Sequence, residues 1–430
     1  MSASGTTASR GARDDRELWD EGQQLDGNDA SRVIGGLRAE WDRVFREPIA
    51  FYREKYSAAG LGADGFPELD DIPLTRKHEL RSNEGANPPF GTHRTVGPDA
   101  AARVSATTGT TGKPWLIFYS KRDLEIMVSL QYQHTWRVGL RPGHHFAHSW
   151  PGGMYPTAVL GGRHLLDLRI LEIPVGPPFS LEQAAGHVEL WQTLGIDALM
   201  CTASQLQTYD EAASSLGVDL ADVLAGSRLI FVEASCQFEP VRRRIENAYG
   251  VRLHNLSGAG EVLGFVTSDC RYHQGLHIPA GNHHIQVCDP VTGRALPAGE
   301  RGTLVVSLWG MDAFCLRYDV EDIVVAEAGD CPCGQAGPRY TLIGRSADRA
   351  IVAGRWILPL DVQLGLEDFA APEFQLVAGE SDALRLTVET DRPAEVEEAL
   401  SARFEVPVRA VASERGSLPR ATFKPRRVAT

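Results

Sequence analysis

The segment between Ser105 and Pro114 carries the residues of this chain best suited to holding a polyphosphate. Its central residues are Thr107, Thr108, Gly109, Thr110, Thr111, Gly112 and Lys113. Glycine lets backbone N–H groups turn toward an anion, threonine hydroxyls add donors, and lysine adds a compact positive charge. A plain glycine- and threonine-rich turn is the alternative interpretation. We favour a phosphate-binding loop, and the ligand that this composition indicates is ATP.

The spacing does not fit the Walker-type P-loop. Gly109 lies too close to Gly112 for the Walker spacing of glycine and lysine. Pro114 also stands where that motif needs a Ser or Thr to bind magnesium. We therefore expect a phosphate loop of another kind.

Length and charge narrow the class of protein. With 430 residues the chain exceeds the size at which one core stops growing, so two or more structural units are expected. A formal net charge of -13 disfavours a nucleic acid or an anionic membrane as partner. We find no apolar run of membrane-spanning length and no cationic segment followed by an apolar one at the amino terminus. The sequence predicts a cytoplasmic protein that acts on a small-molecule substrate.

The cysteines suggest a metal site. Their number, seven, is odd and does not suit a complete disulfide framework, so reduced thiols are expected. Cys270 precedes His277 by seven residues, and Cys331 and Cys333 flank a proline further on. Three thiolates and one imidazole make the tetrahedral shell of a structural zinc ion, which would stabilise the fold and take no part in catalysis. Buried thiols beside a turn are the alternative, since the spacing matches no zinc-finger or ribbon pattern. Four further residues compete as ligands: His273, His283, His284 and Cys288.

The elements that must position these groups follow from the apolar pattern. Residues 1–31 have few apolar anchors and are expected to be flexible, and helical spacing begins at Val33 and continues to Tyr52. Between about Val104 and Val306, short β-rich runs alternate with helical stretches, which indicates crossovers and a largely parallel sheet. The clearest runs are the strands Trp115–Tyr119, Ala198–Thr202 and Leu229–Val232 and the helices Lys121–Arg137 and Phe238–Ala248.

The last third of the chain has a different pattern. Two strands around the turn Asp289–Gly293 predict a β-rich subdomain, and a domain boundary is expected at Gly344. Beyond it, the predicted elements are Arg349–Val352, Pro359–Phe369, Ala383–Val388, Pro393–Phe404 and Val408–Val411. We predict an α/β fold with a large N-terminal domain (32–343) of mainly parallel sheets plus the β-rich subdomain, followed by a small α+β C-terminal domain (344–430).

Seven strings in order resemble motifs of one family, the phenylacetate-CoA ligase branch of the adenylate-forming superfamily, which also holds acyl-CoA synthetases, peptide-synthetase adenylation domains and luciferases. They are Phe51–Arg53 with Ile72–Lys77, Thr107–Pro114, Gly258–Val262, Arg317–Ile323, Cys331–Gly334, Gly344–Asp348, and Leu418–Arg420 ahead of Lys424. The resemblance implies an ATP-dependent ligase that forms an acyl-adenylate with release of pyrophosphate. The acyl group then usually passes to coenzyme A.

The resemblance also implies a role for each matching residue. The threonine loop would hold the β- and γ-phosphates, and Glu261 would help to bind Mg²⁺ beside the α-phosphate. Asp322 would accept hydrogen bonds from the ribose hydroxyls, Arg345 would fix the nucleotide, and Lys424, on a mobile C-terminal lid, would reach the α-phosphate. The rest of the nucleotide pocket would comprise Glu233, Ala234, Ser257 and Gly258. A homodimer is likewise implied only by the resemblance.

Three positions depart from the family pattern. Ser257 stands where relatives carry an aromatic residue that stacks on adenine, and Gly260 stands where they carry Ser or Thr. Ala347 replaces a charged residue, usually aspartate, at the hinge of the C-terminal domain. Adenine stacking is therefore expected to be weaker, and the thioester-forming half-reaction, which needs rotation at the hinge, is the step most affected.

The chemical class of the acid substrate is indicated by His148, Trp150 and Gly153, which precede a crossover of the sheet. Aromatic and imidazole walls suit a flat aryl acid, with ordinary core packing as the alternative for His148 and Trp150. The favoured function is ATP- and Mg²⁺-dependent activation of an aryl or arylacetic acid, most simply by a CoA ligase. Two alternatives stay open. One is a diazotase or other non-CoA ligase that activates nitrite or an acid for coupling to an amine in a natural-product pathway, and the other is a catalytically degenerate nucleotide-binding protein.

Overall fold

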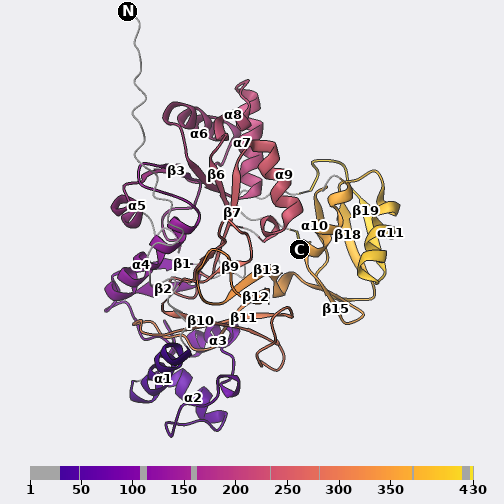
Figure 1. Cartoon of the computed structure of the whole chain (residues 1–430). Coiled ribbons are helices and arrows are strands. Elements are labelled where there is room, and N and C mark those ends of the chain that lie inside the picture. The colour runs from indigo at the N-terminus through magenta and orange to yellow at the C-terminus, as the bar shows by residue number, and fades with distance from the viewer. Residues whose placement is uncertain are drawn as a thin grey trace, which may run out of the picture.

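The computed structural model describes residues 30–47, 49–106, 114–155, 162–232, 234–279, 281–369, 372–418 and 427–429. These residues form a large α/β body and a smaller unit at the C-terminal end of the chain (Figure 1). No helix in the described ranges is long and apolar enough to cross a membrane.

Three helices near the N-terminus lie at one end of the large body: α1 (Ala30–Arg46), α2 (Ala50–Ala58) and α3 (Lys77–Ala86), with the 3₁₀ turn η2 (Leu69–Asp71) between the last two. The helical spacing predicted from Val33 to Tyr52 is realised as the first two of these helices. Their apolar side chains, with Trp41 fully buried, share a core with Leu304 and Val306 of the central sheet. The N-terminal helices are thereby fixed to the antiparallel part of the sheet.

One mixed sheet of eleven strands runs through the body in the order β10-β11-β12-β13-β9-β8-β7-β6-β5-β3-β4. Its parallel part consists of β3 (His145–His148), β4 (Leu171–Pro174), β5 (Ala198–Cys201), β6 (Arg228–Phe231) and β7 (Arg252–Gly258). Its antiparallel part consists of β8 (Val266–Ser268), β9 (Leu276–His277), β10 (His283–Cys288), β11 (Arg301–Leu308), β12 (Tyr318–Ala326) and β13 (Arg339–Arg345). The α/β fold class is confirmed, and β7 joins the predicted parallel and β-rich regions into one continuous sheet.

Helices cover both faces of the parallel part, as crossovers between parallel strands require. They are α4 (Lys121–Arg137), α5 (Arg163–Asp167), α6 (Leu181–Leu194), α7 (Ala203–Ser215), α8 (Leu220–Leu224) and α9 (Glu239–Tyr249), with the 3₁₀ turn η4 (Ser235–Gln237) before the last. The start of α4 is specified locally, because Ser120 Oγ accepts the Asp123 N–H at 3.0 Å. Its bounds are those predicted from the sequence.

The predicted strand at Trp115–Tyr119 does not join the main sheet. β1 (Arg103–Ala106) and β2 (Leu116–Tyr119) pair only with each other, antiparallel, with Ala106 opposite Leu116. The apolar run predicts a strand correctly but not its partner, because a β-rich run carries no information about the strand it will pair with. The two ends of the threonine-rich segment are therefore brought together at the end of a hairpin.

The smaller C-terminal unit has its own core, in which Phe374, Leu384 and Leu400 are fully buried. It contains two small sheets and two helices: β14 (Ala350–Val352), β15 (Arg355–Ile357) and β17 (Gly379–Ser381); β16 (Phe374–Leu376), β18 (Leu384–Val388) and β19 (Val408–Ala412); α10 (Pro359–Gly365) and α11 (Pro393–Phe404). The 3₁₀ turns are η5 (Ser346–Asp348) and η6 (Glu367–Phe369). The unit contacts the large body through Leu358, which packs on Ile343, and through an Arg301–Asp361 ion pair of 2.7 Å. The domain boundary at residue 344 stays a prediction.

Candidate functional site

Nine of the residues proposed for the site lie outside the described ranges: Thr107, Thr108, Gly109, Thr110, Thr111, Gly112, Lys113, Glu233 and Lys424. The described residues on both sides of the threonine loop still locate its ends. Ala106 faces Leu116 across the β1–β2 hairpin, and the Ala106 N–H donates to the Met154 carbonyl at 2.7 Å. The loop therefore begins beside the segment that leads to Tyr155.

Glu261 lies in the turn after β7, and its side chain is 13% exposed. The turn needs glycine just before it, because a Cβ on Gly258 would lie 2.6 Å from the Phe265 carbonyl oxygen. Lys77, at the start of α3, places its Nζ 2.5 Å from Glu261 Oε1. Burial alone would raise the pKa of Glu261, but the neighbouring Lys77 ammonium holds it below its usual value. Glu261 is thus an anionic carboxylate at the end of a parallel strand.

Asp322 and Arg345 face each other across β12 and β13. The Asp322 side chain is 8% exposed, and its Oδ1 lies 2.9 Å from Arg345 Nε. The Asp322 carboxylate raises the pKa of Arg345, and the charge of Glu261 raises it further. Glu261, Asp322 and Arg345, which come from three separate sequence motifs, therefore lie close enough to act on one another electrostatically.

An aromatic group adjoins this cluster. Tyr155 packs edge-on against Trp150 with ring centroids 5.7 Å apart. Burial raises the pKa of Tyr155 to about 12, and the charges of Arg345 and Glu261 also act on its hydroxyl. The structure therefore places Trp150 beside the charged cluster through Tyr155, which sequence analysis did not single out.

The remaining residues proposed for the substrate pocket are less closely connected. His148 Nε2 lies 3.0 Å from Glu172 Oε1 on β4, and this contact lowers the pKa of Glu172. Within the described part of the chain, His148 makes no hydrogen bond or ion pair with Glu261, Asp322 or Arg345. Gly153 is exposed and has a φ of 69°, a conformation that glycine adopts without strain.

Ser257 lies on β7, and Ala234 packs beside the β12–β13 pair. Ser257 is buried within β7, opposite Thr267, whose hydroxyl lies 2.9 Å from Tyr340 Oη. A buried serine offers no ring for adenine to stack on. Ala234 packs against Ile323 and Ile343 beside the strands that carry Asp322 and Arg345.

Two charged residues near Glu261, Asp322 and Arg345 were assigned no role in the sequence analysis. Lys77 belongs to one of the family-like strings, but nothing in its spacing indicates that it reaches a residue near position 261. Glu321 has a φ of 66°, beside an irregularity in the β12–β13 pairing, and its N–H donates to Asp319 Oδ1 at 2.9 Å. Burial raises the pKa of Glu321, and Lys77, Arg345 and Glu261 act on it. A non-glycine residue in the left-handed region commonly marks a functional site, but this signal is absent from the sequence.

A cavity of about 70 Å³ lies against Glu261. Its aromatic lining consists of Tyr52, His93, Trp115, Phe118, Phe314 and Tyr318. His148, Trp150 and Gly153 do not line this cavity.

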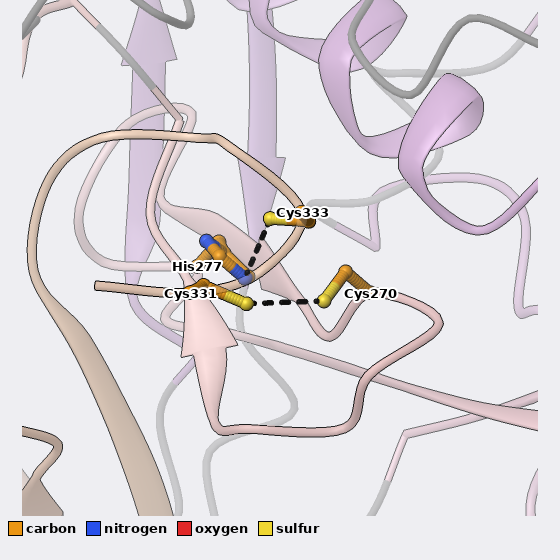
Figure 2. Close-up of side chains that lie close together, drawn as sticks. All are labelled: Cys270, His277, Cys331 and Cys333. Carbon is orange, nitrogen blue, oxygen red and sulfur yellow. Dashed lines mark hydrogen bonds between the residues drawn. The ribbon is translucent and has the colours of Figure 1, made fainter. Parts of the chain in front are cut away.

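The four residues proposed as metal ligands come together in a buried cluster (Figure 2). Cys270 Sγ lies 3.6 Å from Cys331 Sγ, and Cys333 Sγ lies 3.7 Å from His277 Nε2. All four ligand atoms lie within 4.8 Å of one another. Hydrogen bonding from Cys270 and from His277 lowers the pKa of Cys333, whereas the same contact with Cys333 raises the pKa of Cys270, so Cys333 is the member of the pair that favours a thiolate.

The competing residues lie outside this cluster, and three of them have other side-chain partners. His273 Nδ1 lies 2.7 Å from Asp269 Oδ2, and His283 Nε2 lies 2.9 Å from the Leu263 carbonyl. Cys288 Sγ lies 3.5 Å from Arg317 Nη2, and His284 pairs with Ser307 across β10 and β11. None of these residues is a member of the four-residue cluster.

No family model matches the sequence. Curated relatives nevertheless align over most of its length. The phenylacetate-coenzyme A ligase of Thermus thermophilus is 30% identical over 361 residues, which cover 81% of this chain and 78% of the relative. The phenylacetate-coenzyme A ligase of Escherichia coli is 26% identical over 377 residues, covering 84% and 83%.

Solved structures agree on the fold. A 2-hydroxyisobutyryl-CoA ligase in its postadenylation state, in complex with 2-HIB-AMP, gives a TM-score of 0.83 at 22% identity, covering 97% of this chain and 93% of that one. The same ligase in its thioesterification state, with 2-HIB-AMP and CoA, gives a TM-score of 0.68.

Proposed function

This chain belongs to the phenylacetate-CoA ligase family of adenylate-forming enzymes, and from that premise we propose that it activates an aryl or arylacetic acid with ATP and Mg²⁺ and transfers the acyl group to coenzyme A. It is an ATP-dependent ligase. One observation supports this choice of substrate and reaction. The charged residues Glu261, Asp322 and Arg345 lie close together, beside the aromatic pair Trp150 and Tyr155. The names of the curated relatives support an arylacetic acid as the substrate class.

In the first half-reaction, a carboxylate oxygen attacks the α-phosphorus of ATP and pyrophosphate leaves. Charge builds up on phosphate oxygens, so the protein acts through positioning and electrostatic stabilisation. In our proposal, the loop Thr107–Lys113 holds the leaving phosphates and Asp322 accepts hydrogen bonds from the ribose hydroxyls. Arg345, whose Nε lies 2.9 Å from Asp322 Oδ1, would keep that carboxylate oriented.

Mg²⁺ fits the proposal at Glu261. The cation would neutralise phosphate charge and orient the α-phosphate, and a hard anionic oxygen suits it. The Glu261 carboxylate is shielded from solvent and held anionic by Lys77. Lys77 would then move between Glu261 and a phosphate oxygen as charge develops.

The C-terminal unit would supply one more positively charged side chain. We assign to Lys424 the contact with the α-phosphate and the substrate carboxylate during adenylation. The greater likeness to a postadenylation state supports an arrangement in which this unit closes on the nucleotide. Rotation near Ala347 would then admit CoA for the second half-reaction.

The proposal includes a structural Zn²⁺ held by Cys270, His277, Cys331 and Cys333. The donor set and the ligand-atom separations support it, because three thiolates and one imidazole make a closed tetrahedral shell. All four residues are buried, so the ion would have no open position for substrate. Its contribution would be to stability.

A direct assay tests the function. The purified full chain is incubated with ATP, Mg²⁺ and a panel of aryl and arylacetic acids, with and without CoA, and AMP release is measured. Sustained AMP release that needs both an aryl acid and CoA is the expected result.

Turnover that instead needs nitrite and an aryl amine would replace the proposal by a diazotase, a function with which Ser257 and Ala347 are compatible. No AMP under any condition would indicate a nucleotide-binding protein without turnover. The homodimer and the cytoplasmic location stay predictions, the former testable by mass photometry.

A further inference from the structure

The proposed zinc site has a neighbour that its four ligands do not explain. Arg137, the last residue of α4, is only 8% exposed although it carries a guanidinium group. We propose that Arg137 is the charge partner of this metal centre and ties together the three chain segments that supply its ligands. The inference rests on the structural zinc ion proposed above and extends it to a residue beyond the ligand set.

The hydrogen bonds of Arg137 reach the segments on either side of the cluster. Its Nε donates to Gln335 Oε1 at 2.9 Å, and its Nη1 donates to Ser268 Oγ at 2.8 Å. Gln335 follows Cys333 by two positions, and Ser268 precedes Cys270 by two. One guanidinium group therefore anchors two of the three segments directly.

Gln335 extends the connection to the third segment. Its Nε2 donates to the carbonyl of Ile278 at 2.9 Å, and Ile278 directly follows His277. The single oxygen of the same amide accepts from Arg137. The path from Arg137 through Gln335 thus ends beside the one imidazole ligand.

The charge of Arg137 needs an anion, because a buried cation without one is strongly unfavourable. Within the described part of the chain, no carboxylate forms an ion pair with Arg137. Two carboxylates directly precede ligands in the sequence: Asp330, before Cys331, is exposed, and Asp269, before Cys270, is taken up by His254 at 3.0 Å and His273 at 2.7 Å. The partner must come largely from the cluster itself.

The cluster supplies that charge when a metal ion is bound. Three thiolates, one neutral imidazole and one Zn²⁺ carry a net charge of about -1, which one guanidinium balances. Burial lowers the pKa of Arg137 to about 10, whereas the charges of Cys333, Cys270, Asp269 and Cys331 act to raise it. With Zn²⁺ bound, the metal ion, its four ligands and Arg137 would thus form a neutral group, which costs less to bury than the metal centre or Arg137 alone.

The position of the centre in the sheet gives it a structural consequence. Cys331 and Cys333 lie in the connection between β12 and β13, and Asp322, in the middle of β12, is opposite Arg345 at the far end of β13. Helix α4, which ends at Arg137, starts directly after β2 of the hairpin that flanks the threonine loop. The metal centre would therefore fix the end of the β12–β13 pair that lies away from Asp322 and Arg345, the proposed nucleotide-binding residues.

The test measures zinc in the full-length protein by mass spectrometry and its affinity by competition with a chromophoric chelator. We compare wild type, Arg137→Gln, Arg137→Lys and the matched control Arg122→Gln, which removes an exposed arginine of the same helix. About one zinc ion per chain is expected in the wild type. Arg137→Gln should weaken zinc binding at least roughly tenfold, Arg137→Lys should restore much of it because it keeps the charge, and Arg122→Gln should match wild type.

The outcomes separate the two proposals. Wild type with one zinc ion and an unchanged affinity in Arg137→Gln overturns the role of Arg137 but leaves the zinc site standing. Wild type that neither contains nor takes up zinc overturns both, whatever the ligase activity. If Arg137→Gln does not fold, Arg137→Lys and Gln335→Met decide: the inference requires Gln335→Met, which keeps the charge but breaks the bridge to Ile278, to bind zinc more weakly than wild type. Cys236→Ser, at a buried thiol outside the cluster, should leave zinc content unchanged.

Discussion

Lys77 Nζ lies 2.5 Å from Glu261 Oε1, so helix α3 near the N-terminus and the turn after β7 are joined by one ion pair. The two residues are 184 positions apart in the chain. Their pairing links the N-terminal helices to the residue that we propose as the Mg²⁺ ligand. It also balances a carboxylate that burial alone would tend to protonate.

Lys77→Met should lower the rate of ATP–pyrophosphate exchange by roughly 10²-fold, because a preorganised cation beside the reacting phosphate is lost. Lys77→Arg should recover part of this rate, since it keeps the charge but not the geometry. Lys121→Met is the control, because Lys121 is 88% exposed and its one ion pair among the described residues is a surface contact with Glu125. Exchange by Lys77→Met at the wild-type rate would show that the ion pair is merely structural.

Lys424→Ala should lower adenylation by roughly 10²–10³-fold while leaving the melting temperature nearly unchanged. The reason is that its proposed partner, the α-phosphate, is present only during the reaction. Pyrophosphate exchange and a thermal melt on the same sample check both parts. Arg415→Ala, at an exposed position of the same C-terminal unit, serves as control. Wild-type exchange by Lys424→Ala would remove this residue from the mechanism.

Ala347→Pro should separate the two half-reactions. Proline fixes φ near -65° and so restricts rotation in the connection at η5 between the large body and the C-terminal unit. Pyrophosphate exchange should stay close to wild type, whereas CoA-dependent product formation should fall by about tenfold or more. Equal rates for both half-reactions in the variant and in wild type would exclude a hinge at this position.

Acid should destabilise the protein through its buried histidines. His283 is fully buried, and burial lowers its pKa to about 4. In the unfolded chain a histidine has a pKa of about 6.5, so the unfolded state binds more protons between these two values. The free energy of unfolding should therefore fall as the pH drops from about 6.5 toward 4, with a slope of up to about 1.4 kcal/mol per pH unit for this one group.

Urea titrations of wild type and His283→Leu at several pH values measure this dependence. The variant should lose part of the slope because it lacks the buried proton-binding site. His78→Leu, at an exposed position, should keep the full slope. Identical slopes for wild type and His283→Leu would mean that His283 is not held neutral by the fold.

The sequence predicted helices and strands well where neighbouring residues specify them. The helix Lys121–Arg137 is specified by its Ser120 cap and its spacing, and α11 (Pro393–Phe404) begins at its proline as predicted. The strand at Trp115–Tyr119 exists, but its partner β1 was not predicted, because pairing depends on which other strand is sterically available. The continuity of the eleven-stranded sheet was missed for the same reason.

The amino-acid sequence by itself determined the family, the α/β class and the identity of the charged residues placed in the site, since these depend on residue type and order along the chain. Only the tertiary structure decided which of them meet. It brought Lys77 to Glu261, Glu321 into a strained position beside them, and Arg137 to the thiol cluster. Contacts between residues far apart in the sequence depend on packing and on the balance of buried charge. Neither can be predicted from the spacing of the residues along the chain.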